Sequence, residues 1–197
     1  AAPAGIFSGA IALQANPGAH LIGYNYEKEV GNIIVQCYGK NVFMVDVSFA
    51  DWRDMHSLCD VAKSVTWIDH HASAYRQMEL HGTPLKYGNF ELVRQLHFET
   101  ENWGAARWTW EYFFRGRALP PIIEAVAAYD VFRDYGSEDW KNIYFPLRFS
   151  TGQFRTPQEV LRHFTFSGNE DGLFRDMVRS GRSIAAYVDS ENEFVVN

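Results

Sequence analysis

SVTWIDHH, at residues 64–71, is an apolar run that ends on one acid and two histidines. An upstream run, NVFMVD at residues 41–46, has the same form and also ends on an acid. Runs that are apolar on both faces are typical of parallel strands covered by helices on each side. Because ligands bind beyond the carboxyl ends of the strands in open parallel sheets, we expect Asp46 and Asp69 to face one cleft.

Helical patterns separate the expected strands. Residues 5–14 and 52–62 have helical spacing, and Ser48 or Asp51 is a plausible N-cap of the second helix. Further strands are expected at residues 20–24 and 92–98, and a short apolar segment occupies residues 33–35. This alternation predicts the α/β class, with a parallel sheet of about five strands flanked by helices.

Helical patterns dominate the rest of the chain. We expect helices at residues 104–114, 121–132, 157–166 and 171–187, with Thr156 as the N-cap of the third. No linker, repeat or low-complexity tract interrupts the sequence. The pattern therefore predicts an α/β domain over residues 1–150 and a helical C-terminal extension, residues 151–197, packed on it as a layer.

Composition narrows the functional classes. The chain has 197 residues, of which 47% are hydrophobic and 21% charged, as in a globular protein with a real core. A net charge of −6 argues against long duplex nucleic acid as a partner. Two cysteines without metal-ligand spacing indicate neither a disulfide framework nor a thiolate site, which favours the cytoplasm. No segment is long and apolar enough to predict a membrane span.

Three residues form a candidate ligand set for a hard divalent metal: Asp46, His70 and Asp130. Mg²⁺ and Mn²⁺ prefer oxygen ligands, and Mn²⁺ also accepts imidazole. Such a centre would lower the pKa of a bound water and neutralise a phosphoryl group. We expect Asp69 to orient the neighbouring imidazole, and His71 to hold or protonate a phosphate oxygen.

Each of these residues also has a purely structural interpretation. Residues 69–71 can be a strand-to-loop junction with two solvated imidazoles, and Asp130 can simply end a helix. An aromatic stripe at residues 103–114 could offer stacking faces to bases, although core packing is favoured for aromatics at helical spacing. The arginines at positions 107, 133, 148 and 155 could meet phosphate, but scattered arginines on helices are usually solvated.

The motifs resemble those of the DHH phosphoesterases. VFMVDVSF at residues 42–49 looks like the second motif of this family, VTWIDHH at 65–71 like the third, and AAYD at 127–130 like the fourth. GAARWTW at 104–110 resembles the glycine-alanine helix between the third and fourth motifs. The resemblance covers roughly residues 2–135 in the family's order. It implies a DHH-type fold, metal ligands at Asp46, His70 and Asp130, and a phosphate contact at His71.

The first motif departs from the family pattern. Family members carry two acids in a sequence like Asp-x-Asp-Gly, whereas this chain reads Ala2-Pro3-Ala4-Gly5. This is either an altered or clipped form of an active protein or a naturally degenerate member. The loss of two carboxylates is expected to empty at least one of the two metal positions of an intact site. No glycine-rich, histidine-bearing motif of a C-terminal substrate domain (DHHA1 type) follows.

The resemblance implies a Mn²⁺- or Mg²⁺-dependent phosphoesterase or phosphodiesterase that acts through metal-activated water. The expected substrate is a nucleotide or a short single-stranded oligonucleotide, and Ala2 and Ala4 could leave this chain inactive or impaired. The alternative is a non-catalytic DHH-type domain that binds a nucleotide or a protein partner. An inorganic pyrophosphatase is less attractive, because the histidine that precedes the first motif in such proteins is absent.

Overall fold

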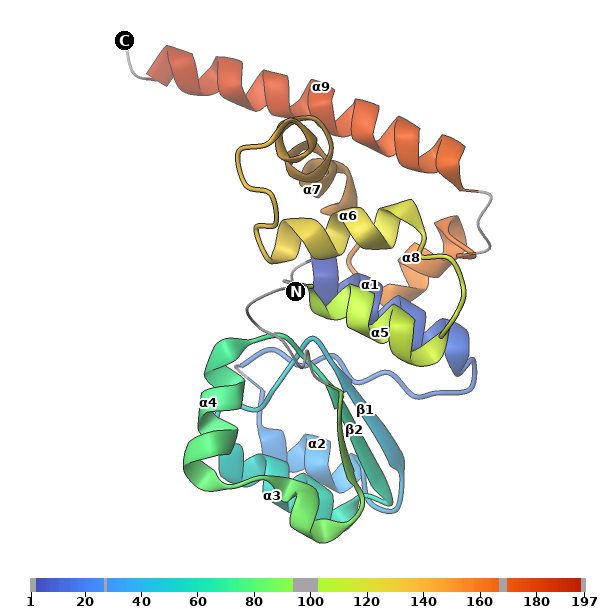
Figure 1. Cartoon of the computed structure of the whole chain (residues 1–197), viewed down its shortest axis with the longest axis vertical. Coiled ribbons are helices and arrows are strands. Elements are labelled where there is room, and N and C mark those ends of the chain that lie inside the picture. Colours follow the sequence, from blue (N-terminus) through green and yellow to red (C-terminus); the bar gives the residue numbers. More distant parts are fainter. Residues whose placement is uncertain (1–2, 27, 94–102, 167–169, 196–197) are drawn as a thin grey trace.

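The computed structural model describes residues 3–26, 28–93, 103–166 and 170–195. These residues form two layers, which lie one above the other in Figure 1. The lower layer holds a parallel sheet with three helices against it, and the upper layer consists of helices alone. The structure is therefore of the α/β class, with a helical layer after the sheet.

Three parallel strands make up the sheet in the described part of the chain: β1 (Asn41–Val45), β2 (Ser64–Ile68) and β3 (Phe90–Val93). β2 is central, and Met44 of β1 is in register with Trp67 of β2. All three strands run the same way, so their carboxyl ends meet at one edge of the sheet. The acids that follow β1 and β2 are placed at this edge.

One face of the sheet is covered by α2 (Val30–Gln36), α3 (Trp52–Val61) and α4 (Ala72–His81). Their core contains Trp52, Met55 and Trp67, which are almost fully buried. The side chain of Asp51 accepts a hydrogen bond from the backbone of Arg53, which confirms it as the N-cap of α3. A short 3₁₀ helix, η1 (Pro84–Tyr87), then leads from α4 to β3.

The opposite face of the sheet meets α1 (Pro3–Ala15) and α5 (Ala105–Phe113). Phe43 of β1 packs against Phe113 of α5, with the ring centroids 5.0 Å apart. α6 (Pro121–Asp130) lies next to α1 and α5, and most of its residues are buried. These three helices therefore connect the sheet to the upper layer.

The upper layer is completed by a π-helical turn, η2 (Trp140–Tyr144), and by α7 (Phe145–Thr151), α8 (Pro157–His163) and α9 (Asp171–Val195). Phe7 of α1 is fully buried between Phe154 and Phe164, with both ring centroids 5.9 Å away. Thr156 caps α8 through its hydroxyl, as the sequence predicts. The expected domain boundary at residue 150 falls within α7, and it stays a prediction.

The expected sheet of about five strands is larger than the sheet of the described residues, which has three strands. Residues 20–24 are irregular: Ile22 and Tyr24 pack against the core beside the sheet, but the segment pairs with no strand among the described residues. The apolar segment at residues 33–35 lies within helix α2. The strand expected at residues 92–98 begins earlier, as β3, and its part after Val93 lies outside the described residues.

The sequence predicts no membrane-spanning segment, and the helices of the structure can be compared with this expectation. Among the described residues, no helix is both long enough and apolar enough to cross a membrane. The longest helix, α9, is amphipathic and carries charged residues along its length.

Candidate metal centre

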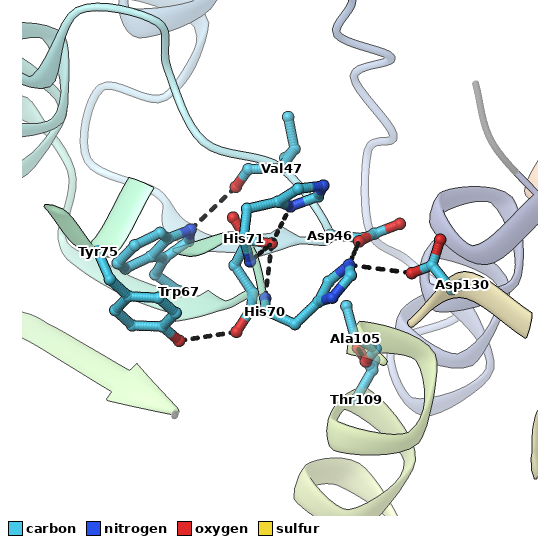
Figure 2. A network of polar contacts seen from close by, with 10 residues as sticks. Asp46, Val47, Trp67, His70, His71, Tyr75, Ala105, Thr109 and Asp130 are labelled. Atoms are coloured by element: carbon cyan, nitrogen blue, oxygen red, sulfur yellow. Dashed lines mark hydrogen bonds and ion pairs between the residues drawn. The ribbon is translucent and has the colours of Figure 1, made fainter. Parts of the chain in front are cut away.

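Two carboxylates converge on the imidazole of His70, which follows β2. Its Nε2 atom lies 3.2 Å from Oδ1 of Asp46 and 2.9 Å from Oδ2 of Asp130. Figure 2 shows the carboxylates of Asp46 and Asp130 both pointing toward this nitrogen. Asp46 comes from the end of β1, and Asp130 is the last residue of α6. The structure thus brings together the three residues that the sequence predicts as metal ligands.

The three facing atoms are buried and close, yet they are not aligned as hydrogen bonds with any described residue. Leaving such atoms unpaired is costly, and a cation between them would satisfy all three. Two carboxylate oxygens and one imidazole nitrogen are ligands that Mn²⁺ accepts, while Mg²⁺ favours the oxygens. The donor set therefore fits a divalent metal ion.

The backbone of Asp46 also marks this position. Its φ angle is 55°, in the left-handed region that side-chain-bearing residues rarely adopt. The backbone N–H of Asp46 donates to the carbonyl of Ile68 at 2.9 Å, which continues the β1–β2 pairing. Strained backbone of this kind clusters at functional sites. Here it turns the carboxylate away from the strand direction and toward His70.

Burial and neighbouring charge act together on the protonation of these groups. Burial raises the pKa of Asp46 to about 6, and the neighbouring imidazole of His70 opposes part of this effect. Burial alone would lower the pKa of His70, but Asp130 and Asp46 outweigh it and raise that pKa to about 10. In the metal-free protein the imidazolium therefore occupies the place of a cation between the two acids.

Asp69 organises the turn that carries both histidines. Its side chain is fully buried, and its Oδ1 accepts from the backbone N–H of His70 at 2.8 Å. The same oxygen lies 2.6 Å from Nδ1 of His71. The hydroxyl of Tyr75 in α4 donates to the carbonyl of Asp69 at 2.7 Å, which fixes the turn from below. Asp69 thus contacts the residue that the sequence predicts it to orient, and the orienting role stays a prediction.

His71 differs from His70 in exposure and partner. Its side chain is 44% exposed, and the hydrogen bond with Asp69 raises the pKa of the imidazole. With Nδ1 held by the carboxylate, Nε2 is the ring nitrogen left to face a ligand. Asp46, Asp69, His70 and His71 each offer a ligand atom within 4.8 Å of the others. These four residues could hold a metal ion. In the other arrangement, His71 contacts a substrate that the metal ion binds.

Small residues let two helices approach the site. A Cβ atom on Gly5 in α1 would lie 3.2 Å from Oδ2 of Asp46. A Cβ atom on Gly104 would lie 2.7 Å from the carbonyl of Ala127 in α6, closer than real contacts allow. In Figure 2, Ala105 of α5 lies next to the ring of His70. These glycines set the positions of α1, α5 and α6 around the cluster.

The expected first-motif positions are placed only in part. Ala4 is buried in the first turn of α1, and it lines a small cavity of about 40 Å³ together with Asp130. Ala2 lies outside the described residues. The cavity is also lined by Tyr129, which belongs to the AAYD motif, and by Arg148, which is one of the four arginines that the sequence offers as phosphate contacts.

Comparison with known proteins identifies no relative of this chain. No family model, no curated protein and no solved structure matches it. The DHH resemblance accordingly depends on the motif residues, and the functional interpretation depends on the geometry of the cluster.

Proposed function

We propose that this chain is a DHH-type domain that hydrolyses a phosphate ester of a nucleotide or short oligonucleotide with Mn²⁺ or Mg²⁺. The observation that carries the proposal is the convergence of Asp46 and Asp130 on Nε2 of His70, with the three facing atoms buried and unaligned. Buried acids around an imidazole are expensive to maintain without a function.

In this proposal Asp46, His70 and Asp130 hold the metal ion. A bound divalent ion activates water and neutralises charge on a phosphoryl group. Asp69 holds Nδ1 of His71 and fixes the ring so that Nε2 faces the substrate. His71 then donates a hydrogen bond to a non-bridging phosphate oxygen or a proton to the leaving oxygen. Its raised pKa keeps this proton available near neutral pH.

Ala4 supports a second candidate, a non-catalytic DHH-type domain that binds a nucleotide or a protein partner. Ala4 borders the cavity that Asp130 also lines, so a carboxylate that would complete a two-metal site is absent there. Mechanisms that need two ions would then be slow or absent. Fold and ligand binding would be retained, because the cluster of Asp46, His70 and Asp130 remains.

Metal titration followed by turnover tests the proposal. We expect Mn²⁺ to raise the melting temperature of the full chain, since a ligand that binds only the folded state stabilises it. We then expect hydrolysis of the dinucleotide pApA that depends on Mn²⁺ and is lost in His71→Ala. Stabilisation without turnover would favour the binding domain. The absence of any Mn²⁺ effect on melting and turnover would refute the metal-dependent activity.

A further inference from the structure

Four aromatic side chains gather just beyond the metal-site end of α6, and we refer to them as the aromatic cluster: Tyr129, Phe132, Tyr135 and Trp140. The rings of Tyr129 and Trp140 are stacked at 5.4 Å with an interplanar angle of 16°. Phe132 stacks on Trp140 as well, at 5.7 Å and 23°. Tyr129 and Phe132 thus each stack nearly parallel to Trp140, whereas the ring of Tyr135 is tilted by 57° to both Phe132 and Trp140.

Two of these rings face solvent rather than core. Phe132 is 63% exposed and Tyr135 is 74% exposed, whereas Trp140 beneath them is 6% exposed. Phe132 also has a left-handed backbone with φ of 53°, which is costly for a residue with a bulky side chain. Folding therefore holds Phe132 outward at an energetic cost. No other described residue of the chain stacks on the outer rings besides the members of the cluster.

The aromatic cluster directly adjoins the metal centre. Asp130 stands between Tyr129 and Phe132 in the sequence, and its carboxylate contacts His70 at 2.9 Å. Tyr129 and Asp130 also line the same small cavity at the start of α1. A ligand that reaches the metal with one end can therefore reach the rings with its other end.

Arg148 of α7 places an exposed guanidinium next to Tyr129 of the aromatic cluster. Its Nη1 donates to the hydroxyl of Tyr129 at 3.2 Å, and its side chain lines the cavity with Asp130. Among the described residues, no carboxylate lies within ion-pair distance of Arg148, unlike Arg107 and Arg133, which share Glu124. A guanidinium left without an acid beside a metal site suits a phosphate group.

We propose that the aromatic cluster is a nucleobase-stacking platform, with Arg148 as a phosphate contact, so that the substrate carries a base. The inference rests on the proposed function, because it assigns residues that bind the base and the phosphate of the substrate proposed for the same centre. Stacking is tolerant of sequence, since every base has a π face. The platform selects nucleotides and short oligonucleotides over inorganic polyphosphates, which have no ring to stack.

The charged residues around the aromatic cluster favour a nucleobase over an anionic membrane surface as its ligand. Asp134 and Glu138 lie in the same segment, with side chains 58% and 83% exposed, and they pair with Arg133 and Lys141, each at 3.7 Å. Acids repel anionic lipid, whereas they accept hydrogen bonds from the hydroxyls of a ribose or the exocyclic amine of a base. A membrane would need a rim of unpaired cations, whereas Arg133 and Lys141 beside the rings are each paired with an acid.

Binding of AMP and of ribose 5-phosphate to the full chain tests the platform by calorimetry, with Mn²⁺ and with chelator. We expect the double variant Phe132→Ala, Tyr135→Ala to bind AMP at least about tenfold more weakly, because an aromatic stack contributes that much per base. Ribose 5-phosphate should bind wild type and double variant alike. Arg148→Gln should weaken both ligands, because both carry the phosphate.

Two further variants separate stacking from general damage. Phe132→Tyr keeps an aromatic ring and should retain AMP binding. Tyr38→Ala removes a ring of similar exposure, 75%, next to the opposite end of β1 and should leave both ligands unaffected. Equal AMP affinity in wild type and double variant would overturn the platform, and so would a wild type that does not bind millimolar AMP.

The outcomes also distinguish the platform from the catalytic proposal. Loss of AMP binding in the double variant, in a protein that does not hydrolyse pApA, would support the platform and reject catalysis. Hydrolysis of pApA with unchanged efficiency in the double variant would support catalysis and reject the platform. Circular dichroism of each variant verifies that both losses occur in folded protein.

Discussion

The Nε2 atom of His70 lies 2.9 Å from Oδ2 of Asp130. This contact joins residues that are far apart in sequence, one after the central strand β2 and one at the end of α6 in the helical layer. The site is therefore built by both layers and not by the sheet alone. Ligand binding at this point should stabilise the contact between them.

Replacement of either partner should remove metal binding. We expect His70→Ala and Asp130→Asn to weaken Mn²⁺ binding by more than about tenfold, since loss of partners outside the ligand shell already costs that much. Calorimetric titration with Mn²⁺ at constant pH measures the effect. His20→Ala is the matched control, because His20 is exposed beyond the far end of α1. Equal losses in all three variants would show that the effect is unrelated to this cluster.

Sequence reasoning predicted that Asp46 and His70 lie together because the ends of strands are local features of the sequence. An apolar run that ends on an acid identifies both the strand and its carboxyl end, as at Asp46 and Asp69. Parallel packing then places such ends at one edge. The position of Asp130 could not be predicted from such local features, because it depends on how α6 packs on α1 and α5. The family resemblance supplied that information, and periodicity did not.

Other features of the site were not accessible from sequence. Aspartate adopts the left-handed backbone more often than most residues, but no pattern in the sequence shows that Asp46 does so. Arg148 reaches the cavity only because α7 packs against α6, a tertiary contact with no motif. The strand expected at residues 20–24 failed for a similar reason, since an apolar segment becomes a strand only if a neighbouring strand pairs with it.

Close packing in the helical layer leads to a prediction about stability. A Cβ atom on Gly181 of α9 would lie 2.1 Å from the carbonyl of Pro146, which no real contact allows. We expect Gly181→Ala to destabilise the protein by about 1–3 kcal/mol, the usual cost of overpacking. Urea unfolding monitored by circular dichroism provides the measurement.

The same helix contains the matched control. Gly172 lies in the first turn of α9, and a Cβ atom there would meet nothing within 4 Å. Gly172→Ala should stabilise the chain slightly, by up to about 1 kcal/mol, because alanine loses less entropy in a helix. A Gly181→Ala variant as stable as Gly172→Ala would contradict the close approach of α9 and α7.

The metal-free protein should lose stability at high pH through His70. The two acids raise the folded pKa of His70 to about 10, above the value of about 6.5 in an unfolded chain. This contribution is therefore fully present below pH 6.5 and is lost as pH rises through 10. Asp46 titrates at about 6, so it does not change within the window from pH 7 to pH 10.

Urea unfolding with chelator at pH 7 and pH 10 measures this loss. Wild type should be more stable than His70→Gln at pH 7, because glutamine leaves the two acids without a cation. The difference should shrink at pH 10, where the imidazole is losing its proton. A difference that is the same at both pH values would mean that His70 is already neutral at pH 7.

Introduction of an acid at position 4 tests whether Ala4 stands where the DHH motif has a metal ligand. Ala4 is 2% exposed and borders a small cavity that Asp130 also lines, so a carboxylate at position 4 would lie at the same cavity as Asp130. Metal-free Ala4→Asp should be less stable than wild type at neutral pH, because it adds a buried acid near Asp130. The first turn of α1 favours an acid only weakly.

Mn²⁺ should reverse that effect. We expect Ala4→Asp to bind Mn²⁺ more tightly than wild type and to raise Mn²⁺-dependent hydrolysis of pApA, more so when combined with Ala2→Asp. Ala4→Asn has nearly the same shape without the charge, so it should show neither gain. Calorimetry and product analysis measure both quantities. If the acids change neither affinity nor turnover, the alanines are not vacated ligand positions, and the DHH assignment of the first motif fails.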